Sequence, residues 1–268
     1  MLQVRLAQLR GMAVYEFRQH WRGRLLVALI FGFVLTIGLD VLVGGSVRCD
    51  SIALSDFAVC QQGVTITVTT VTLFLALPLA VLLPIMVAEV IPLDTQRGVR
   101  SWLDAMPLHT GTYLLGKLLG LWLALAVALL IAMFITGTLW WLATGAFDML
   151  VYFQIWVFGI GVVVLLNSGL GVLLPAGLTT RRRAILWNTA WIIVLAGLVQ
   201  GSDFLSYFNP LRMPIINYHI AVYAPMFSPS PESDQLVTLL KPLVGGLAGL
   251  AIVFCVAWMW LRGQSGRT

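Results

Sequence analysis

The sequence DTQRGVRSWLDAMPLHTGTYLLGK, residues 94–117, is a polar interruption between two long apolar runs. Charged residues make up only 10% of the chain and hydrophobic residues 60%, with a mean hydropathy of +0.95. Soluble domains carry roughly a quarter charged residues, so this composition predicts an integral membrane protein. The apolar runs reach about 20 residues and lack the alternation of a membrane barrel, which favours a bundle of transmembrane helices.

Six apolar segments have the length of membrane-spanning helices. We expect them at residues 25–43, 64–92, 113–141, 150–174, 184–199 and 242–261, within one all-α transmembrane domain, residues 1–268. The second segment is longer than a bilayer requires and contains Pro78 and Pro84, so it should tilt, kink or project beyond the headgroups. Residues 201–240 contain several prolines and fit short interfacial or re-entrant helices on the outer side.

Lysine and arginine are distributed unequally between the two sides of this predicted bundle. With the N-terminus inside, 13 of the 16 lysines and arginines fall on the inner side. Cytoplasmic loops carry such an excess, so both termini are predicted to be cytoplasmic. The net charge of +5 is thereby explained by topology, and no nucleic-acid partner is expected.

Residues 1–24 predict a basic helix with one apolar stripe. Apolar side chains recur at helical spacing from Leu2 to Phe17, and five arginines supply the polar side. Such a helix suits the membrane interface, where arginines meet anionic headgroups. The alternative is a frayed, positively charged tail.

Cys49 and Cys60 both fall in the predicted first outer loop, residues 44–63. Their spacing makes loop closure feasible, and a disulfide would form if that compartment is oxidising. The spacing alone leaves the bridged and the free forms open.

Motifs for catalysis are missing from the sequence. It contains neither HExxH, as in zinc proteases, nor GxxxxGK[ST], the phosphate-binding loop of ATPases. We therefore expect no catalytic residue, metal or cofactor on this chain. Glu89 could lie inside the apolar zone as a pathway residue, or it could pair with an arginine of the N-terminal helix or of residues 94–117. Asn167 lies deep in the fourth segment. It is a candidate pathway residue, but an asparagine there more often forms a hydrogen bond between helices.

A short rigid helix is predicted at residues 97–107, within the cytoplasmic interruption. Gly98 opens it and Pro107 stops it, because proline cannot continue a helix interior. The residues at helical spacing between them are Val99, Trp102, Leu103 and Met106. Such an element could dock a cytoplasmic partner, and the alternative is an ordinary interfacial loop whose Trp and Leu rest on lipid.

This region resembles the permease subunits of ABC transporters of the ABC-2 type. The residues that match in order and spacing are Gly98, Leu103, Pro107, Leu115, Gly116 and Lys117. Val99 stands where the family usually has Thr, and Ser101 stands where an acidic residue is common. Asn209-Pro210-Leu211 is similar to a motif often found after the fifth helix of that family.

The resemblance implies a permease that pairs with a second copy or a paralogue and binds two cytoplasmic ATPase subunits, which hold ATP and Mg. It implies an exporter in the cell (inner or plasma) membrane of a prokaryote, in contact with membrane lipid, with residues 1–24 as an elbow helix. The residues assigned to ATPase coupling are Arg97, Gly98, Arg100, Trp102, Leu103, Asp104, Met106 and Pro107. Candidate polar or pathway residues are Glu89, Thr69, Thr72, Asn167 and Asn188. The alternative is a non-transporting membrane assembly or scaffold protein that binds another cytoplasmic partner.

Overall fold

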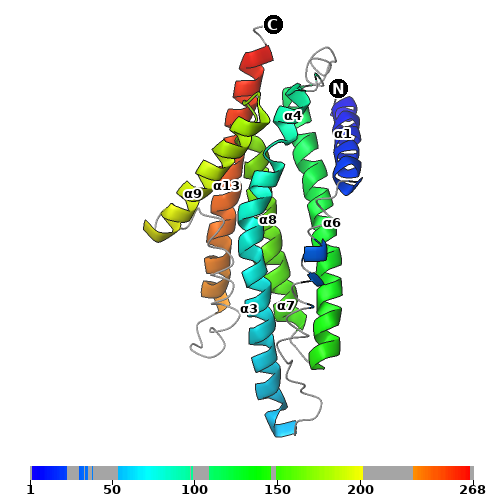
Figure 1. Cartoon of the computed structure of the whole chain (residues 1–268), viewed down its shortest axis with the longest axis vertical. Coiled ribbons are helices and arrows are strands. Elements are labelled where there is room, and N and C mark those ends of the chain that lie inside the picture. Colours follow the sequence, from blue (N-terminus) through cyan, green and yellow to red (C-terminus); the bar gives the residue numbers. More distant parts are fainter. Residues whose placement is uncertain are drawn as a thin grey trace.

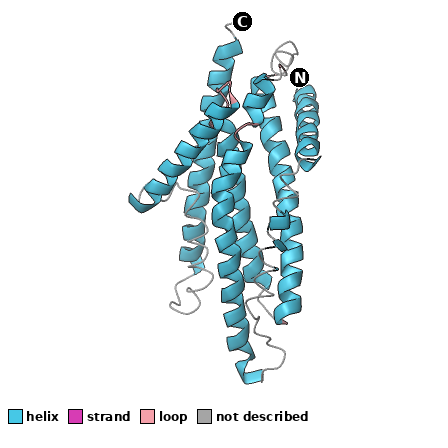
Figure 2. Cartoon of the chain, in the orientation of Figure 1, coloured by secondary structure: helices cyan, strands magenta, loops and turns pink. Residues whose placement is uncertain are grey.

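The computed structural model describes residues 2–22, 30–32, 34–35, 38, 54–96, 98, 109–145, 149–201 and 232–265. This part of the chain is helical and contains no strand (Figure 2). The elements are α1 (Leu2–Arg22), α3 (Leu54–Val87), α4 (Val90–Gln96), α6 (Thr110–Thr144), α7 (Met149–Gln154), the π-helix η1 (Ile155–Gly161), α8 (Val162–Leu173), α9 (Arg181–Gly201) and α13 (Glu232–Ser265). The prediction of an all-α chain is confirmed for these residues.

Helices α3, α6, α8 and α13 run side by side along the long axis, and α1 lies against α6 (Figure 1). Helix α8 is central, since it contacts α3, α6 and α13. Helix α9 diverges from the others at an angle (Figure 1). The short α4, the start of α6, all of α1 and the end of α13 gather at one end of the molecule. We call this the α4 end.

Two described helical stretches, Thr110–Thr144 and Tyr152–Leu173, are long and apolar enough to cross a bilayer. Leu247–Arg262 is a shorter apolar stretch. The 35 residues of α6 give a length of about 50 Å at 1.5 Å per residue, more than a hydrocarbon core of about 30 Å requires. Gly145 ends α6 with a positive φ of 75°, which a glycine adopts without steric cost. These lengths support the membrane association predicted from composition.

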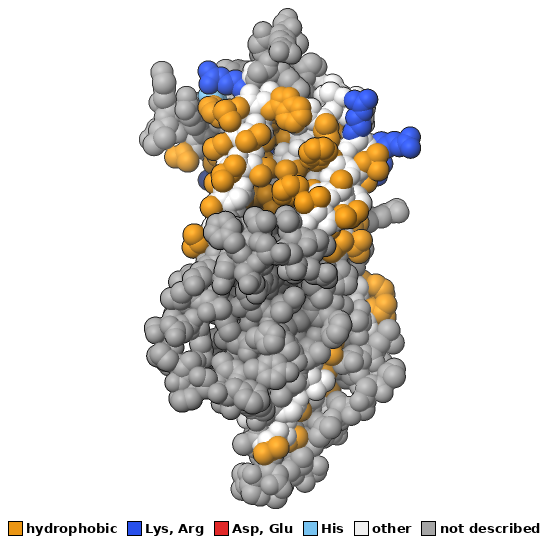
Figure 3. All heavy atoms as spheres, turned by 90° about the vertical axis from the view of Figure 1, so that its left-hand side faces the viewer, with side chains coloured by type: hydrophobic (Ala, Val, Ile, Leu, Met, Phe, Trp, Pro, Cys, Tyr) orange, Lys and Arg blue, Asp and Glu red, His pale blue; other side chains and the backbone are white. Residues whose placement is uncertain are grey.

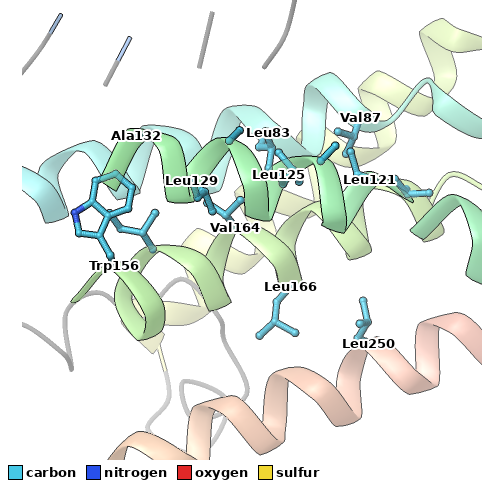
Figure 4. Packing of buried hydrophobic residues seen from close by; sticks show 14 of the residues in the cluster. Leu83, Val87, Leu121, Leu125, Leu129, Ala132, Trp156, Val164, Leu166 and Leu250 are labelled. Atoms are coloured by element: carbon cyan, nitrogen blue, oxygen red, sulfur yellow. The ribbon is translucent and has the colours of Figure 1, made fainter. Parts of the chain in front are cut away.

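The core is built around one stripe of α6. Its members recur at helical spacing and are almost fully buried: Leu121, Ala124, Leu125, Ala128 and Ala132. The alanines let neighbouring backbones approach closely, which strengthens van der Waals packing. Figure 4 shows Leu83 and Val87 of α3 and Val164 of α8 directed toward this stripe, whereas Leu166 of α8 faces Leu250 of α13.

The second predicted crossing, residues 64–92, differs from the helix observed. Helix α3 begins earlier, at Leu54, and ends earlier, at Val87, with Pro78 and Pro84 inside it. Ala88 and Glu89 then form a turn, and α4 carries Pro92 in its first turn. Proline fits a first turn because the N–H groups there have no intrahelical partner. The long helix therefore ends before the segment that leads into residues 97–107.

Other predicted boundaries also move. Helix α9 begins at Arg181 rather than at 184, because the basic turn supplies its first residues. Helix α13 begins at Glu232, so the end of the predicted outer segment 201–240 is helical. The fourth segment is built from α7, η1 and α8 in succession. Residues 25–43 lie largely outside the described part of the chain.

Candidate functional site

The two ends of the quoted stretch, Asp94 and Lys117, lie against each other. Asp94 belongs to α4 and Lys117 to the second turn of α6, and their Oδ2 and Nζ atoms are 2.8 Å apart. The hydroxyl of Tyr113 also donates to Asp94 Oδ2, at 2.7 Å. His109 caps the start of α6, where its Nδ1 accepts from the N–H of Gly111 at 3.4 Å. Residues 97–108 therefore connect two helices, α4 and α6, which are joined to each other through Asp94, Tyr113 and Lys117.

Glu16 of α1 completes this group. Its Oε1 lies 2.8 Å from Lys117 Nζ, and the two side chains are only 2% and 1% exposed. Lys117 thus holds one carboxylate from α4 and one from α1, and it lies 5.6 Å from the centre of the Tyr113 ring. We call Glu16, Asp94, Tyr113 and Lys117 the neck cluster. It joins α1, α4 and α6.

Two glycines of α6 allow α1 to come this close. Gly116 and Gly120 are one turn apart on the face that meets α1, and the absence of side chains at both positions leaves room for α1. A Cβ at Gly116 would stand 2.7 Å from Met12 Cβ, and one at Gly120 would overlap Glu16 Cβ and stand 2.7 Å from Ala13 O. The side of α1 that was predicted to lie on lipid therefore lies partly on α6.

The electrostatics of the neck cluster are set by burial. Desolvation raises the pKa of Glu16, and the neighbouring Lys117 ammonium opposes that shift. His20 Nε2 lies 3.8 Å from Glu16 Oε2. Burial, together with the charge of Lys117, lowers the pKa of His20 to about 4, so His20 is neutral at pH 7. Lys117 is consequently the cation on which the cluster depends.

Glu89, in the turn before α4, makes an ion pair with Arg181 at the start of α9. Its partner comes from the basic turn rather than from the N-terminal helix or from residues 94–117, as the sequence-based alternative had supposed. The pair connects α9 to the base of α4 and is partly exposed. A second electrostatic link therefore runs from the neck region to α9.

Asn188 of α9 forms a different junction near the same end. Its Nδ2 donates to Pro84 O of α3 at 2.9 Å and to Gly171 O of α8 at 2.7 Å. Both acceptors lie in the last turn of their helices, where carbonyls lack intrahelical partners, and the residue four places after Gly171 is Pro175, which has no N–H. We call this the Asn188 junction. Its buried amide satisfies carbonyls that the two helix ends leave open.

The remaining predicted polar residues are placed as follows. Thr72 is fully buried, and its hydroxyl donates to Val68 O at 2.6 Å. Asn167 is buried in α8, and its Nδ2 has no hydrogen-bond partner among the described residues. Thr69 lies in α3, but its side chain is outside the described part. The structure does not bring these residues to the neck cluster.

Of the residues assigned to ATPase coupling, only Gly98 falls within the described chain. It is exposed and has a φ of 71°, a conformation that favours glycine, and it follows α4 after one residue. The others, Arg97, Arg100, Trp102, Leu103, Asp104, Met106 and Pro107, lie outside the described residues. Cys60 is disulfide-bonded and Cys255 is a free thiol, whereas Cys49 lies outside the described residues.

Sequence reasoning missed Glu16 and did not assign a role to Lys117 beyond the motif. A signal was present, because Glu16 is the sole acidic residue in residues 1–24. It also falls at helical spacing with Ala13, Phe17 and His20, on the face that was considered apolar. Gly116 and Gly120 likewise have the spacing of residues that allow close helix approach. A charged residue on an apolar face, opposite such a pair, predicts a buried ion pair.

Among the described residues, no group of three or more His, Cys, Asp or Glu side chains could hold a metal ion. In the neck cluster, each charged group is engaged by another side chain of the chain itself. Comparison with known proteins adds no assignment: no protein-family model matches the chain, and no curated protein sequence matches it.

Proposed function

We propose that this chain is the permease subunit of an ATP-binding cassette transporter of the ABC-2 type, working as an exporter. In this proposal six helices cross the cell membrane of a prokaryote, with both termini in the cytoplasm. The subunit pairs with a second copy or a paralogue. Two cytoplasmic ATPases, which hold ATP and Mg, dock on residues 97–107 of each half of the assembly.

The observation that carries the proposal is the neck cluster. A loop that transmits force must be fixed to the helices it moves, and residues 97–108 leave from α4 and return into α6. Asp94 and Lys117 join those two helices at 2.8 Å, and Glu16 adds α1. A displacement of the docked segment would therefore move three helices together rather than bend one of them.

The strength of this joint follows from its burial. Removing one partner of a buried ion pair costs about 3–5 kcal/mol, because the remaining charge loses its compensation. Lys117 and Glu16 are both almost fully buried. The α1–α4–α6 unit should consequently stay assembled through a cycle of ATPase closure and opening. Closure of the ATPases would then rock this unit against α3, α8 and α13.

The resemblance of Gly98 to Lys117 to the ABC-2 pattern supports the identity of the partner. The missing phosphate-binding loop means that hydrolysis must be supplied by another subunit. The positive φ of Gly98 fits a sharp turn between α4 and the docking segment. Trp102, Leu103, Met106 and Pro107 would make the apolar docking contact, with Arg97, Arg100 and Asp104 around it.

The test is co-purification with an ATPase encoded beside this chain. The double variant Trp102→Ala/Leu103→Asp should lose the ATPase from the complex. The chain offers a matched control, because Trp141 and Leu142 form the same dipeptide near the end of α6 away from α4, with both side chains exposed. Trp141→Ala/Leu142→Asp should retain the ATPase.

Equal retention by both double variants would show that residues 97–107 do not dock the ATPase. Capture of a different cytoplasmic protein that is lost only with Trp102→Ala/Leu103→Asp would favour the scaffold alternative. A neighbouring gene without a Walker A motif would point the same way.

A further inference from the structure

Helices α9 and α13 leave an apolar groove between them near the α4 end. Its volume is about 260 Å³, and aliphatic side chains from the end of α8, from the turn that follows it and from α13 line it together with Trp187 of α9 and Trp260 of α13. The two tryptophans are about half exposed, and Trp260 is packed on Gly177, whose added Cβ would stand 2.5 Å from the indole. Figure 3 shows the hydrophobic side chains gathered on this face, with Lys and Arg side chains on both sides of them.

The two helices that flank the groove carry arginines toward the α4 end: Arg182 and Arg183 at the start of α9, and Arg262 near the end of α13. Arg183 precedes Trp187 by one helical turn, so both belong to the same face of α9. Arg182 and Arg183 are exposed, and no carboxylate of the described residues forms a salt bridge with them, unlike Arg181, which pairs with Glu89. On the α13 side, Arg262 lies 5.6 Å from the ring centre of Trp258. The lining of the groove is therefore apolar, and the helix segments that flank it toward the α4 end are cationic.

We propose that this groove binds one anionic phospholipid of the inner leaflet. An acyl chain lies along the aliphatic lining, and the headgroup phosphate is held by Arg182 and Arg183. Guanidinium groups match phosphate oxygens in pairs, which gives these contacts directionality as well as charge. Trp187 and Trp260 fall near the inner ends of the fifth and sixth crossings of the proposed topology, where tryptophan prefers the boundary between hydrocarbon and headgroups. Basic pockets between helices on the cytoplasmic side are the form that anionic-lipid sites take.

Charge also argues against a second copy of this chain as the occupant. A two-fold contact presents the same patch on both subunits. It would bring the arginine pair of one copy toward that of the other, with no described carboxylate on this rim except Glu89, which Arg181 already engages. The inference rests on the membrane placement in the proposed function and does not depend on the ATPase partner.

The experiment uses the purified full-length chain without an ATPase. Phosphatidylglycerol and phosphatidylcholine with the same acyl chains are added in turn, and bound lipid is measured by native mass spectrometry. Arg182→Gln/Arg183→Gln should weaken phosphatidylglycerol binding roughly 30-fold, about fivefold for each arginine. Phosphatidylcholine binding should weaken less, because the choline cation offsets the charge of its phosphate. Val256→Trp, which fills the groove at a half-exposed position, should weaken both lipids. The matched control is Arg18→Gln/Arg22→Gln, two exposed arginines of α1 with the same charge change, which should bind like wild type.

Three results would overturn the proposal. Equal weakening by the two arginine variants would indicate diffuse attraction to the surface. A wild-type chain that does not prefer phosphatidylglycerol would exclude the site. A dimer that Val256→Trp dissociates, with lipid binding unchanged, would assign the groove to a second copy. Loss of ATPase docking by Trp102→Ala/Leu103→Asp is measured separately, so either proposal can fail while the other stands.

Discussion

The neck cluster and the Asn188 junction each join three helices near the α4 end, but with different chemistry. The neck cluster joins α1, α4 and α6 through a buried lysine and two carboxylates. The Asn188 junction joins α3, α8 and α9 through one neutral amide that donates to two backbone carbonyls. The stability of a buried charged cluster depends on the presence and the protonation of every partner, whereas that of a neutral hydrogen-bonded junction depends on its geometry.

The difference divides the molecule into two groups of helices. Residues 97–108 connect α4 to α6, two helices of the neck cluster. The helices of the Asn188 junction, α3, α8 and α9, form the other group, and the two groups meet in the core where α6 packs against α8 (Figures 1 and 4). A neutral amide that satisfies helix ends provides a fixed reference. The strength of the charged cluster, by contrast, changes when one of its partners is protonated.

The largest expected effect comes from Lys117→Met, which removes the cation that both carboxylates share. Two buried carboxylates would then lack compensation, so the free energy of unfolding should fall by about 3–5 kcal/mol. Denaturant unfolding of the purified chain in detergent measures it. Arg18→Met, on the exposed side of α1, is the control and should leave the value nearly unchanged. Equal stability of the two variants would mean that the neck cluster does not hold α1 in place.

The next effect concerns the close approach of α1 to α6. Gly120→Val places methyl groups where Glu16 and Ala13 already lie, so α1 should be displaced at a cost of about 3 kcal/mol, the upper end for overpacking. Maleimide labelling of Ala13→Cys, in a Cys255→Ser background, should become faster. Gly249→Val is the control, because an added Cβ there meets nothing within 4 Å. Unchanged labelling in Gly120→Val would contradict the packing described.

Asn188→Leu tests the neutral joint. It leaves the carbonyls of Pro84 and Gly171 without their donor, and the expected cost is about 2 kcal/mol, roughly 1 kcal/mol for each lost hydrogen bond. Because no charge is involved, the loss should be the same at pH 7 and pH 5. Unfolding free energies at the two pH values provide the measurement. A loss that varies with pH would show that the two joints are not independent.

The smallest expected effect is the pH dependence of the charged joint. The pKa of His20 is lowered from 6.5 to about 4, so its contribution to stability is present above 6.5 and is lost as the pH falls toward 4. Glu16 acts in the opposite sense: its pKa is raised, so its contribution is present below 4.5 and is lost as the pH rises through the shifted pKa. Lys117 faces both groups, and Asp94 faces Glu16.

The His20 contribution can be isolated by comparing wild type with His20→Gln. The stability advantage of wild type over this variant should shrink as the pH falls from 6.5 to 4, because the unfolded chain then binds a proton at His20 that the folded chain excludes. Melting temperatures across that range give the difference. An advantage that stays constant would mean that the pKa of His20 is the same in the folded and unfolded states. Arg18→Gln on the same helix should show no such trend.

Part of the candidate site could be predicted from local sequence. Asp94 and Lys117 were recognised as the ends of one polar stretch, and Gly98 as the residue that opens a predicted short helix. Helix α6 was expected from its unbroken apolar run. Each of these depends on neighbouring residues, on hydropathy or on backbone preference, which act over a few residues and can be read from order alone.

The partners could not be predicted in this way. Glu16 and Lys117 are separated by 101 residues, and Asn188 is separated from Pro84 by 104. The sequence offers Glu89 several arginines as possible partners, and in the structure Glu89 forms its ion pair with Arg181. Helix α3 ends at Val87, although the apolar run would allow it to continue to Pro92.

The sequence by itself determined that this chain folds into long helices and where its polar interruptions fall. Apolar runs, prolines and glycines set those features through local backbone energetics and the cost of exposing apolar surface. Only the tertiary structure decided which charges meet at the neck and which carbonyls Asn188 satisfies. A buried charge or an open carbonyl takes whichever partner the packing of distant helices brings within about 3 Å, and that proximity is a property of the whole fold.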